Sequence, residues 1–446
     1  MTTKPAEANW ADLTPAQKRE KRFEAWLEAP GINFATPEAK AGYRARVKRL
    51  IDAISLKKPD RVPTTPFLGE YVAAYCGYTQ KDMMYDVDKC IDAATRCTLE
   101  FDFDAKTAAA APQGKVWEIL ENKQRKWPGD GLPENGSPQF IEGEYMQADE
   151  YDAFIEDETD YRWRTYLPRI WGTAGPLTKL NLATANVGQF GIPEVQAALK
   201  KLMLAGEEAR RYDSQLAAAN RRLTELGYPD FRAAPGPPGG APFDMIGDNL
   251  RGQRGIALDM YKQPEKLLEA IDSYTAKRVR RIHRGPESLR LGGSPVVGFP
   301  LHKGADGFMS DKQFRTFYWP SLRAMILALY EEGYVSELRT QGSYESRLEA
   351  VQDLPKGSVI WHFYLTNLEI GYKALGGTQC IVGSVPQSLL QVGSIKEVEA
   401  YTRKMIDIGG KKGGFMLTSP GALGKEASGD NIKAMIRTVK EYGRYK

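Results

Sequence analysis

The feature that most constrains the fold is a recurring pattern of short apolar segments in the carboxyl-terminal half of the chain. Each segment has the length of a buried strand, each is followed by a polar loop, and most of these loops lead into a helix. At least five such units follow one another, which predicts an α/β fold of the (β/α)8 TIM barrel type rather than an open sheet. The predicted strands cover 296–300, 334–338, 358–363, 379–383 and 414–418.

The chain has 446 residues, more than the roughly 250 residues of a typical single barrel, so additional segments are expected. We predict an N-terminal helical arm over 1–44 and a barrel over 45–446. We also predict an insertion in the barrel at about 112–165, a region rich in glycine, proline and acidic residues. Further expectations are helices at 38–55, 90–100, 194–204 and 207–226, a strand at 99–105, and an irregular proline- and glycine-rich loop at 233–242.

The bulk composition is that of an ordinary globular protein. The formal net charge of +4 is small for this length, which argues against a dedicated nucleic-acid-binding protein. The four cysteines are widely spaced and no signal peptide opens the chain, so we expect a reduced, cytoplasmic protein. No apolar run reaches the roughly 18 residues that a membrane span needs, and no membrane association is expected.

Polar residues gather directly after the predicted strands, where barrel enzymes carry their working groups. The most informative segment is the glycine-rich loop that begins at His302 and Lys303, with one of only three histidines in the chain. The mouth mixes carboxylates, cations and imidazoles, which suits an anionic or polar substrate and acid/base assistance. The residues collected there are Asp102, Asp104, Asp244, Asp248, Arg251, His302, Lys303, Asp306, Arg339, Gln341, Tyr344, Arg347, His362, Tyr364, Asn367 and Ser384.

Several of these residues also have a structural interpretation. Asp248 and Arg251 are three residues apart and fit either a local ion pair at the start of a helix or substrate binding. His362 lies between two aromatic residues at a strand end and fits either a core histidine or a functional one. Asp104 fits either a strand-end cap or a catalytic carboxylate. The glycine-rich surroundings of His302 favour a functional interpretation, because structural histidines lie more often on apolar faces.

Sequence motifs for two other chemistries are missing. The glycine-rich segments contain no Walker pattern, and no Gly-x-Gly-x-x-Gly follows a predicted strand, so nucleotide binding is poorly supported. No Gly-x-Ser-x-Gly elbow occurs, so serine hydrolase chemistry is also poorly supported.

Several short motifs occur in an order that resembles the uroporphyrinogen decarboxylase superfamily. They are Arg61-Val-Pro63, Asp259-Met-Tyr-Lys-Gln-Pro264, Tyr318-Trp-Pro320, Ile381-Val-Gly383-Ser-Val-Pro386, Asn431-Ile-Lys-Ala-Met435 and Glu441-Tyr-Gly443. The resemblance covers roughly residues 45 to 446. It implies a (β/α)8 barrel and one of two chemistries, which are decarboxylation of uroporphyrinogen and methyl transfer involving corrinoid proteins.

The resemblance departs from both chemistries at identifiable positions. The decarboxylases carry an arginine-rich segment after the first strand, where this chain reads Thr65-Pro-Phe-Leu-Gly-Glu70; uroporphyrinogen decarboxylation is therefore not expected. The strand-end aspartate of those enzymes aligns with Asp104. The coenzyme M type methyltransferases bind zinc through His-x-Cys and a later Cys, where this chain reads Arg339-Thr-Gln341-Gly and Pro420-Gly421-Ala422. Zinc needs sulfur or imidazole ligands here, so no zinc is expected.

What remains resembles a branch of the superfamily associated with corrinoid-dependent O-demethylation. This branch is indicated by the loop at 302–310 and the Gly-Ser-Tyr-x-x-Arg-Leu segment at 342–348. We therefore expect a methyltransferase that works with a corrinoid protein as its partner. It would move a methyl group between the cobalamin of that partner and an acceptor such as tetrahydrofolate, or take the methyl group from a methyl ether.

The expected residue roles are proton transfer and substrate binding. The catalytic candidates are His302, Asp104 and Asp248, and the substrate-binding candidates are Arg251, Lys303, Arg339, Gln341, Tyr344, His362 and Asn367. Two other functions stay open, namely a decarboxylase or lyase acting on another anionic substrate, and a non-catalytic paralogue that binds a corrinoid protein. A different metal site, built from His302, His362 and a carboxylate, also stays open. The arm and the insertion would suit a homodimer.

Overall fold

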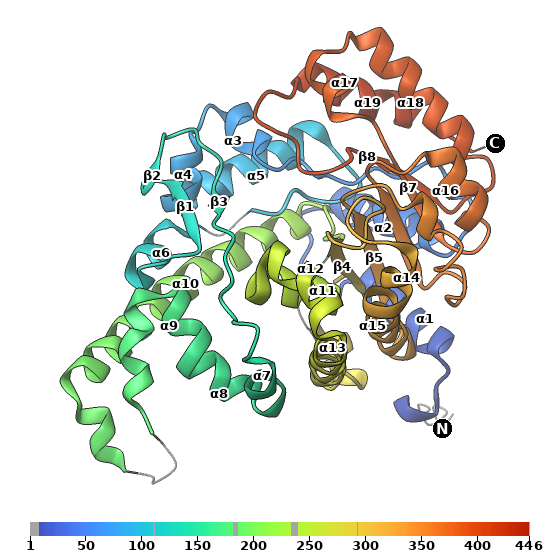
Figure 1. The fold of residues 1–446 in the computed structure, drawn as a ribbon. Coiled ribbons are helices and arrows are strands. Elements are labelled where there is room, and N and C mark those ends of the chain that lie inside the picture. The colour runs from blue at the N-terminus through green and yellow to red at the C-terminus, as the bar shows by residue number, and fades with distance from the viewer. Residues whose placement is uncertain (1–8, 110–111, 182–185, 233–239, 292, 446) are drawn as a thin grey trace, which may run out of the picture.

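The computed structural model describes residues 9–109, 112–181, 186–232, 240–291 and 293–445. Its centre is a parallel sheet of five strands in the order β4-β5-β6-β7-β8 (Figure 1). The strands are β4 (Val296–Leu301), β5 (Val335–Thr340), β6 (Val359–Phe363), β7 (Cys380–Ser384) and β8 (Phe415–Thr418). All five predicted strands are confirmed, because each overlaps an observed strand and differs from it by only one or two residues at its ends.

Three extended segments continue the sheet beyond β8 and complete the barrel. Thr64 forms a parallel bridge to Leu417 of β8. The carbonyl oxygen of Thr64 accepts a hydrogen bond from Asp104 N–H at 2.9 Å, and the carbonyl oxygen of Pro229 accepts one from Lys106 N–H at 2.9 Å. Five strands and three extended segments give the eight positions of a (β/α)8 barrel, and the predicted fold class is confirmed.

Helices cover the outer surface of the barrel. In Figure 1 they surround the strands on the side away from the barrel axis, and α15 contacts β5 while α16 and α18 contact β7. The helices of the carboxyl-terminal half are α11 (Pro242–Ile246), α12 (Gly252–Lys262), α13 (Pro264–Val279), α14 (Asp311–Gln313), α15 (Trp319–Glu331), α16 (Leu368–Leu375), α17 (Gln387–Val392), α18 (Ile395–Gly409) and α19 (Gly429–Tyr442).

Two N-terminal helices, which we call the arm here, close one end of the barrel; the second of them runs past the expected boundary at residue 44. Helices α1 (Pro15–Glu28) and α2 (Pro37–Ile54) begin at threonine caps followed by proline, a strong helix-start signal. Trp26 and Val47 from these helices share an apolar cluster with the strand residues Val335, Ile360 and Met416. Since these strand residues lie in the first half of their strands, the arm covers the amino ends of the strands and leaves the opposite end open.

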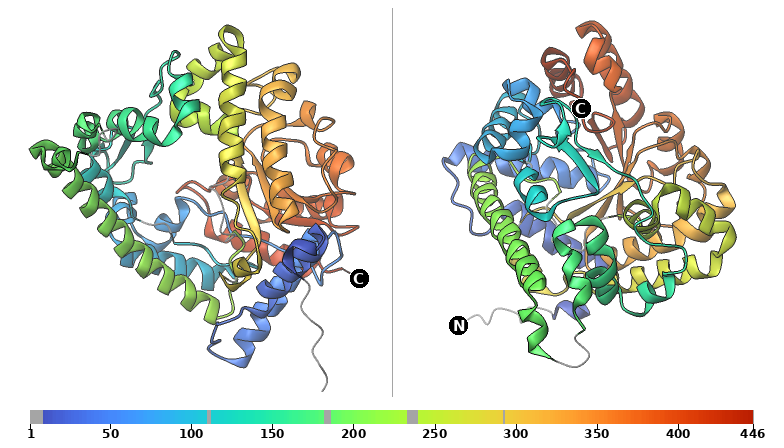
Figure 2. Two further views of the ribbon diagram at one scale, coloured as in Figure 1. Left: turned by 90° about the horizontal axis from the view of Figure 1, so that it is seen from below. Right: turned by 60° about the vertical axis from the view of Figure 1, so that its left-hand side comes forward.

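Two segments differ from the sequence predictions. The expected strand at 99–105 is wrong: α5 (Val87–Phe101) continues to Phe101, and Asp102 ends it in the left-handed conformation. The two helices expected between 194 and 226 are one helix, α10 (Pro193–Glu225), because no residue between them breaks the helical period. The views in Figure 2 show α10 running along one side of the molecule. Most of the loop predicted at 233–242 lies outside the described residues.

The region of the predicted insertion forms a small layer beside the barrel (Figure 1). Strands β1 (Arg125–Pro128), β2 (Gly131–Leu132) and β3 (Gln139–Phe140) form a three-stranded sheet. The surrounding helices are α3 (Tyr71–Cys76), α4 (Gln80–Tyr85), α6 (Gly114–Leu120), α7 (Tyr151–Glu156), α8 (Glu158–Tyr161) and α9 (Leu167–Ile170). Among the described residues, no helix combines the length and apolar character that crossing a membrane requires.

Candidate active site

The interior of the barrel changes from apolar to charged along its strands. Val335 of β5 and Ile360 of β6 belong to the apolar cluster under the arm. Two residues further along the same strands are Glu337 and His362, and Arg339 follows on β5. Because alternate residues of a strand face the same side, Val335, Glu337 and Arg339 all face the barrel axis. The charged layer therefore lies toward the carboxyl ends of the strands.

We refer to this charged layer and the rings beside it as the axial cup; its members are Phe67, Arg232, Glu337, Arg339, His362 and Tyr364. Glu337 accepts hydrogen bonds from Arg232 through both carboxylate oxygens, with 2.6 Å between Nη2 and Oε1. Burial alone would raise the pKa of Glu337, but the charge and hydrogen bonds of Arg232 lower this pKa well below its usual range. Glu337 is thus ionised and balances the charge of Arg232.

His362 forms the floor of the axial cup. Its ring is fully buried, its Nε2 lies 3.0 Å from the carbonyl oxygen of Ser419, and its Nδ1 lies 3.6 Å from Glu337 Oε1. Burial lowers the pKa of His362, so its imidazole is neutral near neutral pH. Of the two interpretations from the sequence, this placement fits the core histidine.

Arg339 and Tyr364 form the wall of the axial cup, and both side chains are half-buried. The Arg339 guanidinium lies 5.5 Å from the centre of the Phe67 ring, and the Phe67 and Tyr364 rings are 6.4 Å apart. Within the described part of the chain, Arg339 makes no hydrogen bond or ion pair, and neither Arg339 Nε nor Tyr364 Oη has a partner although both atoms are buried. These donors are available to a ligand.

A second cluster follows β4 and joins residues that the sequence analysis had singled out. His302 Nδ1 lies 2.6 Å from Asp248 Oδ2, and Lys303 Nζ contacts the other oxygen of the same carboxylate. The His302 side chain is 38% exposed. The hydrogen bond to Asp248 raises the pKa of His302 above its ordinary value. A partly exposed imidazole held by a carboxylate is a suitable general acid or base.

Asp244 fixes the backbone of this second cluster. Its buried carboxylate accepts hydrogen bonds from the main-chain N–H groups of His302 at 2.8 Å and Lys303 at 2.9 Å, and from Tyr318 Oη at 2.7 Å. Asp248 lies one turn later in a π-helical turn, Gly247–Arg251, between α11 and α12. Such turns are frequent at functional sites, and this one directs the Asp248 carboxylate to His302.

The Gly-Ser-Tyr-x-x-Arg segment after β5 holds the loop that follows His302. Arg347 is buried and donates hydrogen bonds to the carbonyl oxygens of Gly304 and Met309, while it also pairs with Asp311. Tyr344, a predicted substrate-binding residue, is buried against this loop. The segment therefore acts on the site by positioning the loop, and the Tyr344 side chain is buried.

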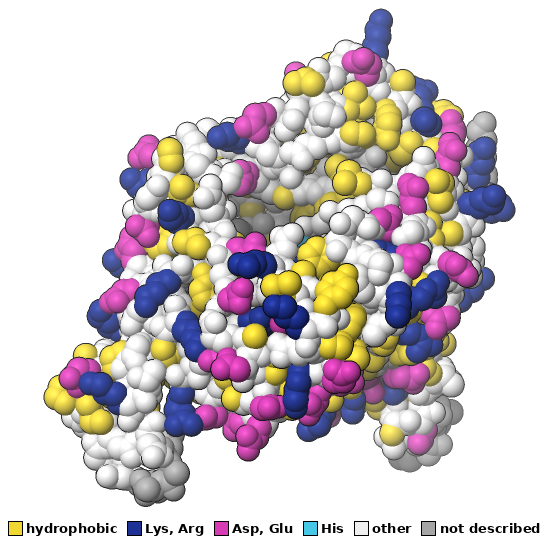
Figure 3. Space-filling model, viewed as in Figure 1, with side chains coloured by type: hydrophobic (Ala, Val, Ile, Leu, Met, Phe, Trp, Pro, Cys, Tyr) yellow, Lys and Arg dark blue, Asp and Glu magenta, His cyan; other side chains and the backbone are white. Residues whose placement is uncertain are grey.

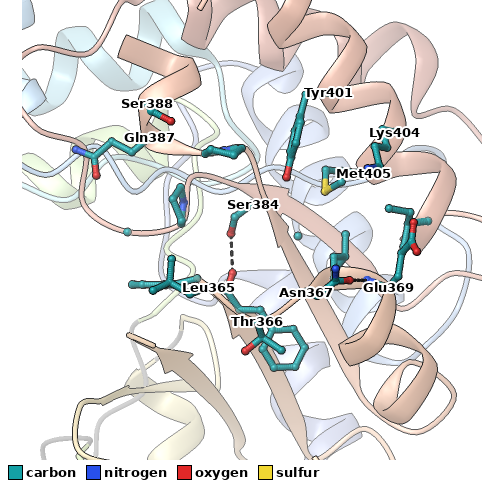
Figure 4. A pocket seen from close by; sticks show the side chains of 18 of the residues that line it. Leu365, Thr366, Asn367, Glu369, Ser384, Gln387, Ser388, Tyr401, Lys404 and Met405 are labelled. Carbon is teal, nitrogen blue, oxygen red and sulfur yellow. Dashed lines mark hydrogen bonds between the residues drawn. The ribbon is translucent and has the colours of Figure 1, made fainter. Parts of the chain in front are cut away.

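A cavity of about 810 Å³ opens over the carboxyl ends of β5 to β8. The close-up in Figure 4 shows Ser384, Asn367 and Thr366 around it, with Tyr401, Lys404 and Met405 contributed by α18. Tyr364 and Gln341 also line it, so this cavity adjoins the axial cup. The face seen in Figure 1 is hollowed near its centre (Figure 3). Asn367 additionally caps α16 through its side-chain oxygen.

The positions that align with the family zinc ligands do not fit zinc; those at 341 and 420–421 lie at this cavity, and Arg339 lies in the axial cup. Gln341, Pro420 and Gly421 line the cavity, and none of them offers a thiolate or an imidazole. In the described ranges, no group of three His, Cys, Asp or Glu residues is arranged to hold a metal ion. Within these ranges, His302 and His362 therefore do not form the alternative metal site.

Arg251 does not reach the site. Its buried guanidinium pairs with Asp259 at 2.6 Å, donates to the carbonyl oxygen of Met146 and lies 3.3 Å from Glu144. The structure therefore supports an ion pair for Arg251, although its partner is Asp259 rather than Asp248. The predicted substrate-binding role is corrected, because Asp259 and the surrounding backbone already occupy the donors.

Asp104 also lies elsewhere. Because α5 extends to Phe101, Asp104 stands near the beginning of its extended segment instead of the end. Its carboxylate, whose side chain is 1% exposed, binds Arg49 Nη1 at 2.5 Å, Arg61 at 2.8 Å and the main-chain N–H of Thr64 at 2.8 Å. All its acceptor positions are used within the protein, so the predicted catalytic role is replaced by a structural one.

Sequence reasoning missed Phe67, Arg232 and Glu337. The signal for Glu337 was present, since Glu337 and Arg339 are charged residues two apart within an apolar strand and must therefore share a face. No comparable signal marks Phe67 or Arg232. Their positions in the axial cup follow only from how the first and third barrel segments pack.

Three comparisons with known proteins bear on the family. Residues 236–442 match the sequence model of a family described as uroporphyrinogen decarboxylase (URO-D). No curated protein sequence matches the chain significantly. Among solved structures, a methyltransferase from Methanosarcina mazei superposes with a TM-score of 0.56 at 15% identity, covering 89% of this chain and 98% of that one. An identity this low shows a shared fold and nothing more.

The family match lies in the half of the chain that carries β4 to β8, His302 and Arg339. The fold match extends over 89% of the chain. The resemblance that the sequence motifs indicated is therefore confirmed over residues 236–442, which match the sequence model of that family. Over most of the chain, the barrel fold is shared with the Methanosarcina mazei methyltransferase.

Proposed function

We propose that this protein is a corrinoid-dependent methyltransferase that takes a methyl group from a small methyl ether, with His302 as the proton donor to the leaving oxygen. The fold shared with a protein named as a methyltransferase supports methyl transfer. The single observation that carries the proposal is the His302–Asp248–Lys303 cluster at the carboxyl end of β4, which is the functional end of a barrel.

The chemistry of ether cleavage explains why such a cluster is needed. The methyl carbon leaves the ether oxygen, and the electron pair of the broken C–O bond stays on that oxygen. The cobalt of a corrinoid on a partner protein would supply the electron pair that forms the new bond to the methyl group. A proton delivered to the oxygen prevents build-up of alkoxide or phenolate charge.

His302 suits this task in its geometry and its charge. Asp248 holds Nδ1, so Nε2 is the ring nitrogen left to act on a substrate, and the partly exposed side chain can reach one. Because the hydrogen bond to Asp248 raises the pKa of His302, more of the imidazole carries its proton near neutral pH. A protonated imidazole is the form required to protonate a leaving oxygen. Transfer to tetrahydrofolate would instead require removal of a proton from the acceptor nitrogen.

The two rival functions are less well supported. The lyase hypothesis relied on Asp104, whose carboxylate is bound by two arginines and a backbone N–H. A mouth filled by bulky side chains would favour the non-catalytic paralogue, whereas a cavity of about 810 Å³ opens over β5 to β8.

The test is an absorbance assay for methylcobalamin formation from cob(I)alamin and aryl methyl ethers, with the purified protein. Replacing His302 with Ala should lower kcat by about 10²-fold or more, as expected for loss of a proton donor. His283→Ala is the matched control, because His283 is an exposed histidine outside the cluster. An unchanged rate for His302→Ala would remove His302 from the mechanism. Demethylation of methylcobalamin by tetrahydrofolate, without ether cleavage, would refute the proposed direction and donor.

A further inference from the structure

The axial cup contains more positive than negative charge. Arg232 and Arg339 contribute two guanidinium groups, and Glu337 contributes one carboxylate, which Arg232 binds through two contacts. His362 adds no charge when neutral, as its lowered pKa indicates. The axial cup therefore carries one net positive charge, because the single carboxylate of Glu337 acts on both guanidinium groups.

Leaving such a charge half-buried is unfavourable unless a ligand compensates it. Burial lowers the pKa of Arg339, which shows that its charged form is poorly solvated, yet a guanidinium stays protonated in proteins. Buried polar groups are normally hydrogen-bonded, and the exceptions call for an explanation. Arg339 Nε and Tyr364 Oη are two such exceptions in one place.

The surroundings of Arg339 define the charge and shape of a ligand. One uncompensated positive charge is matched by one negative charge, which a carboxylate provides. Burial raises the pKa of Tyr364 to about 12, so its hydroxyl remains a donor at neutral pH. The tilted rings of Phe67 and Tyr364, with centres 6.4 Å apart, offer apolar walls beside the guanidinium. Planar aromatic groups pack well against such rings.

We propose that Arg339 and Tyr364 bind the carboxylate of a small aromatic substrate, whose ring lies between Phe67 and the mouth of the barrel. The carboxylate would accept hydrogen bonds from the Arg339 guanidinium and from the Tyr364 hydroxyl. Charge-assisted contacts of this kind are the stronger class of hydrogen bonds and are directional. That the substrate carries a methyl ether rests on the proposed function. That it carries a carboxylate does not.

The strand register relates this subsite to the proton donor. Arg339 pairs with Pro300 in the β4–β5 ladder, and His302 follows Pro300 by two residues. With a rise of about 3.3 Å per residue and about 4.8 Å between strands, the Arg339 and His302 Cα atoms are roughly 8 Å apart. The register therefore places Arg339 on β5 and His302 directly after the neighbouring strand β4, at the same end of the barrel, where one small substrate can contact both.

The experiment measures binding to the full-length protein by calorimetry, without corrinoid, so that it is independent of catalysis. The probes are 4-methoxybenzoate, its neutral analogue 4-methoxybenzamide, and p-aminobenzoylglutamate, which represents a folate tail. We expect the benzoate to bind at least about tenfold more tightly than the benzamide, as a charge-assisted contact predicts. Equal affinity for the two, or no binding of any probe, would overturn the proposal. Binding of p-aminobenzoylglutamate alone would assign the carboxylate to a folate and refute the small aromatic substrate.

Variants test the assignment to Arg339. Arg339→Gln should weaken benzoate binding by about tenfold or more, and Tyr364→Phe, which keeps the ring, by about threefold to tenfold. Arg315→Gln is the control, because Arg315 is an exposed arginine that lies near Glu349 at 3.6 Å, outside the axial cup. Unchanged affinity in Arg339→Gln would overturn the proposal. If Arg339→Gln does not fold, the comparison of benzoate with benzamide on the unmodified protein still decides it. Benzoate binding without methyl transfer would refute the proposed function alone.

Discussion

Replacing Asp104 with Asn separates a structural role from a catalytic one. The Asp104 carboxylate is 1% exposed and lies between Arg49, 8% exposed, and Arg61, 13% exposed. Asn has the same shape and can still accept the hydrogen bond from Thr64 N–H, but it carries no charge. The substitution would leave two nearly buried guanidinium groups with only exposed Asp60 as a counterion.

The size of the effect follows from this geometry. Removing one partner of a buried ion pair costs about 3–5 kcal/mol. An unfolding entropy of about 2.1 cal/mol/K per residue, taken over 446 residues, gives roughly 0.9 kcal/mol/K. The expected decrease in Tm is therefore about 3–5 °C. The matched control is Asp60→Asn, which removes a carboxylate from the same Arg49; its side chain is 64% exposed, so its cost should stay below about 1 kcal/mol.

The assay is calorimetric unfolding of both variants at neutral pH, combined with kcat measured well below Tm. We expect Asp104→Asn to lower Tm by several degrees and to leave kcat per folded molecule within about twofold of the parent, because Asp104 contacts no group of the proposed site. A normal Tm together with a loss of kcat of about 10²-fold or more would refute this reasoning. Asp104 would then be catalytic, as its alignment with the decarboxylase aspartate implied.

Two further predictions concern the proton donor. Since the hydrogen bond to Asp248 raises the pKa of His302 above its ordinary value, the protonated form is present at low pH and is lost as pH rises through that pKa. The kcat/KM for ether cleavage should therefore fall on the alkaline side, and Asp248→Asn should move this limb to lower pH; a pH profile that does not move would exclude the pair. Arg347→Met removes the donors that hold the loop after His302 and should lower kcat by about tenfold to hundredfold. Limited proteolysis should then cut within 304–311 faster than in the parent, and an unchanged cleavage pattern would contradict the positioning role.

The strands of the barrel could be predicted because burial on both faces makes their sequences apolar. A parallel strand covered by helices on its outer face and by the barrel core on its inner face must be apolar on both faces. The segments at β4, β6 and β7 satisfy this rule almost continuously. The prediction of a strand at 99–105 failed because Leu99, Phe101 and Phe103 alternate as in a strand. In the structure, Phe101 belongs to the buried face of α5 and Leu99 is exposed.

The side chains of the site could be predicted where they follow a predicted strand or stand in a polar, glycine-rich segment. His302, Lys303 and Asp248 are brought together by the ends of β4 and α11, and their polar, glycine-rich context marked them. Arg251 was misassigned because its partner, Asp259, is eight residues away across a π-helical turn and α12. Local spacing at three or four residues carries no information about such a pair. The pairing of Arg232 with Glu337 could not be predicted for the same reason, because the two residues are 105 positions apart.

Strand β5 connects the axial cup with the His302 cluster. The proposed binding of the substrate carboxylate and the position of the proton donor are therefore linked. Strand β5 carries Arg339 into the axial cup, and the segment that follows it carries Arg347, which holds the loop after His302. Gln341 N–H, between these two arginines, donates to the carbonyl oxygen of Leu301, the residue before His302. A carboxylate bound at Arg339 would therefore order the same strand that sets the position of the acid. Binding of the anionic end and placement of the proton donor are then coupled through β5, because packed strands do not deform independently.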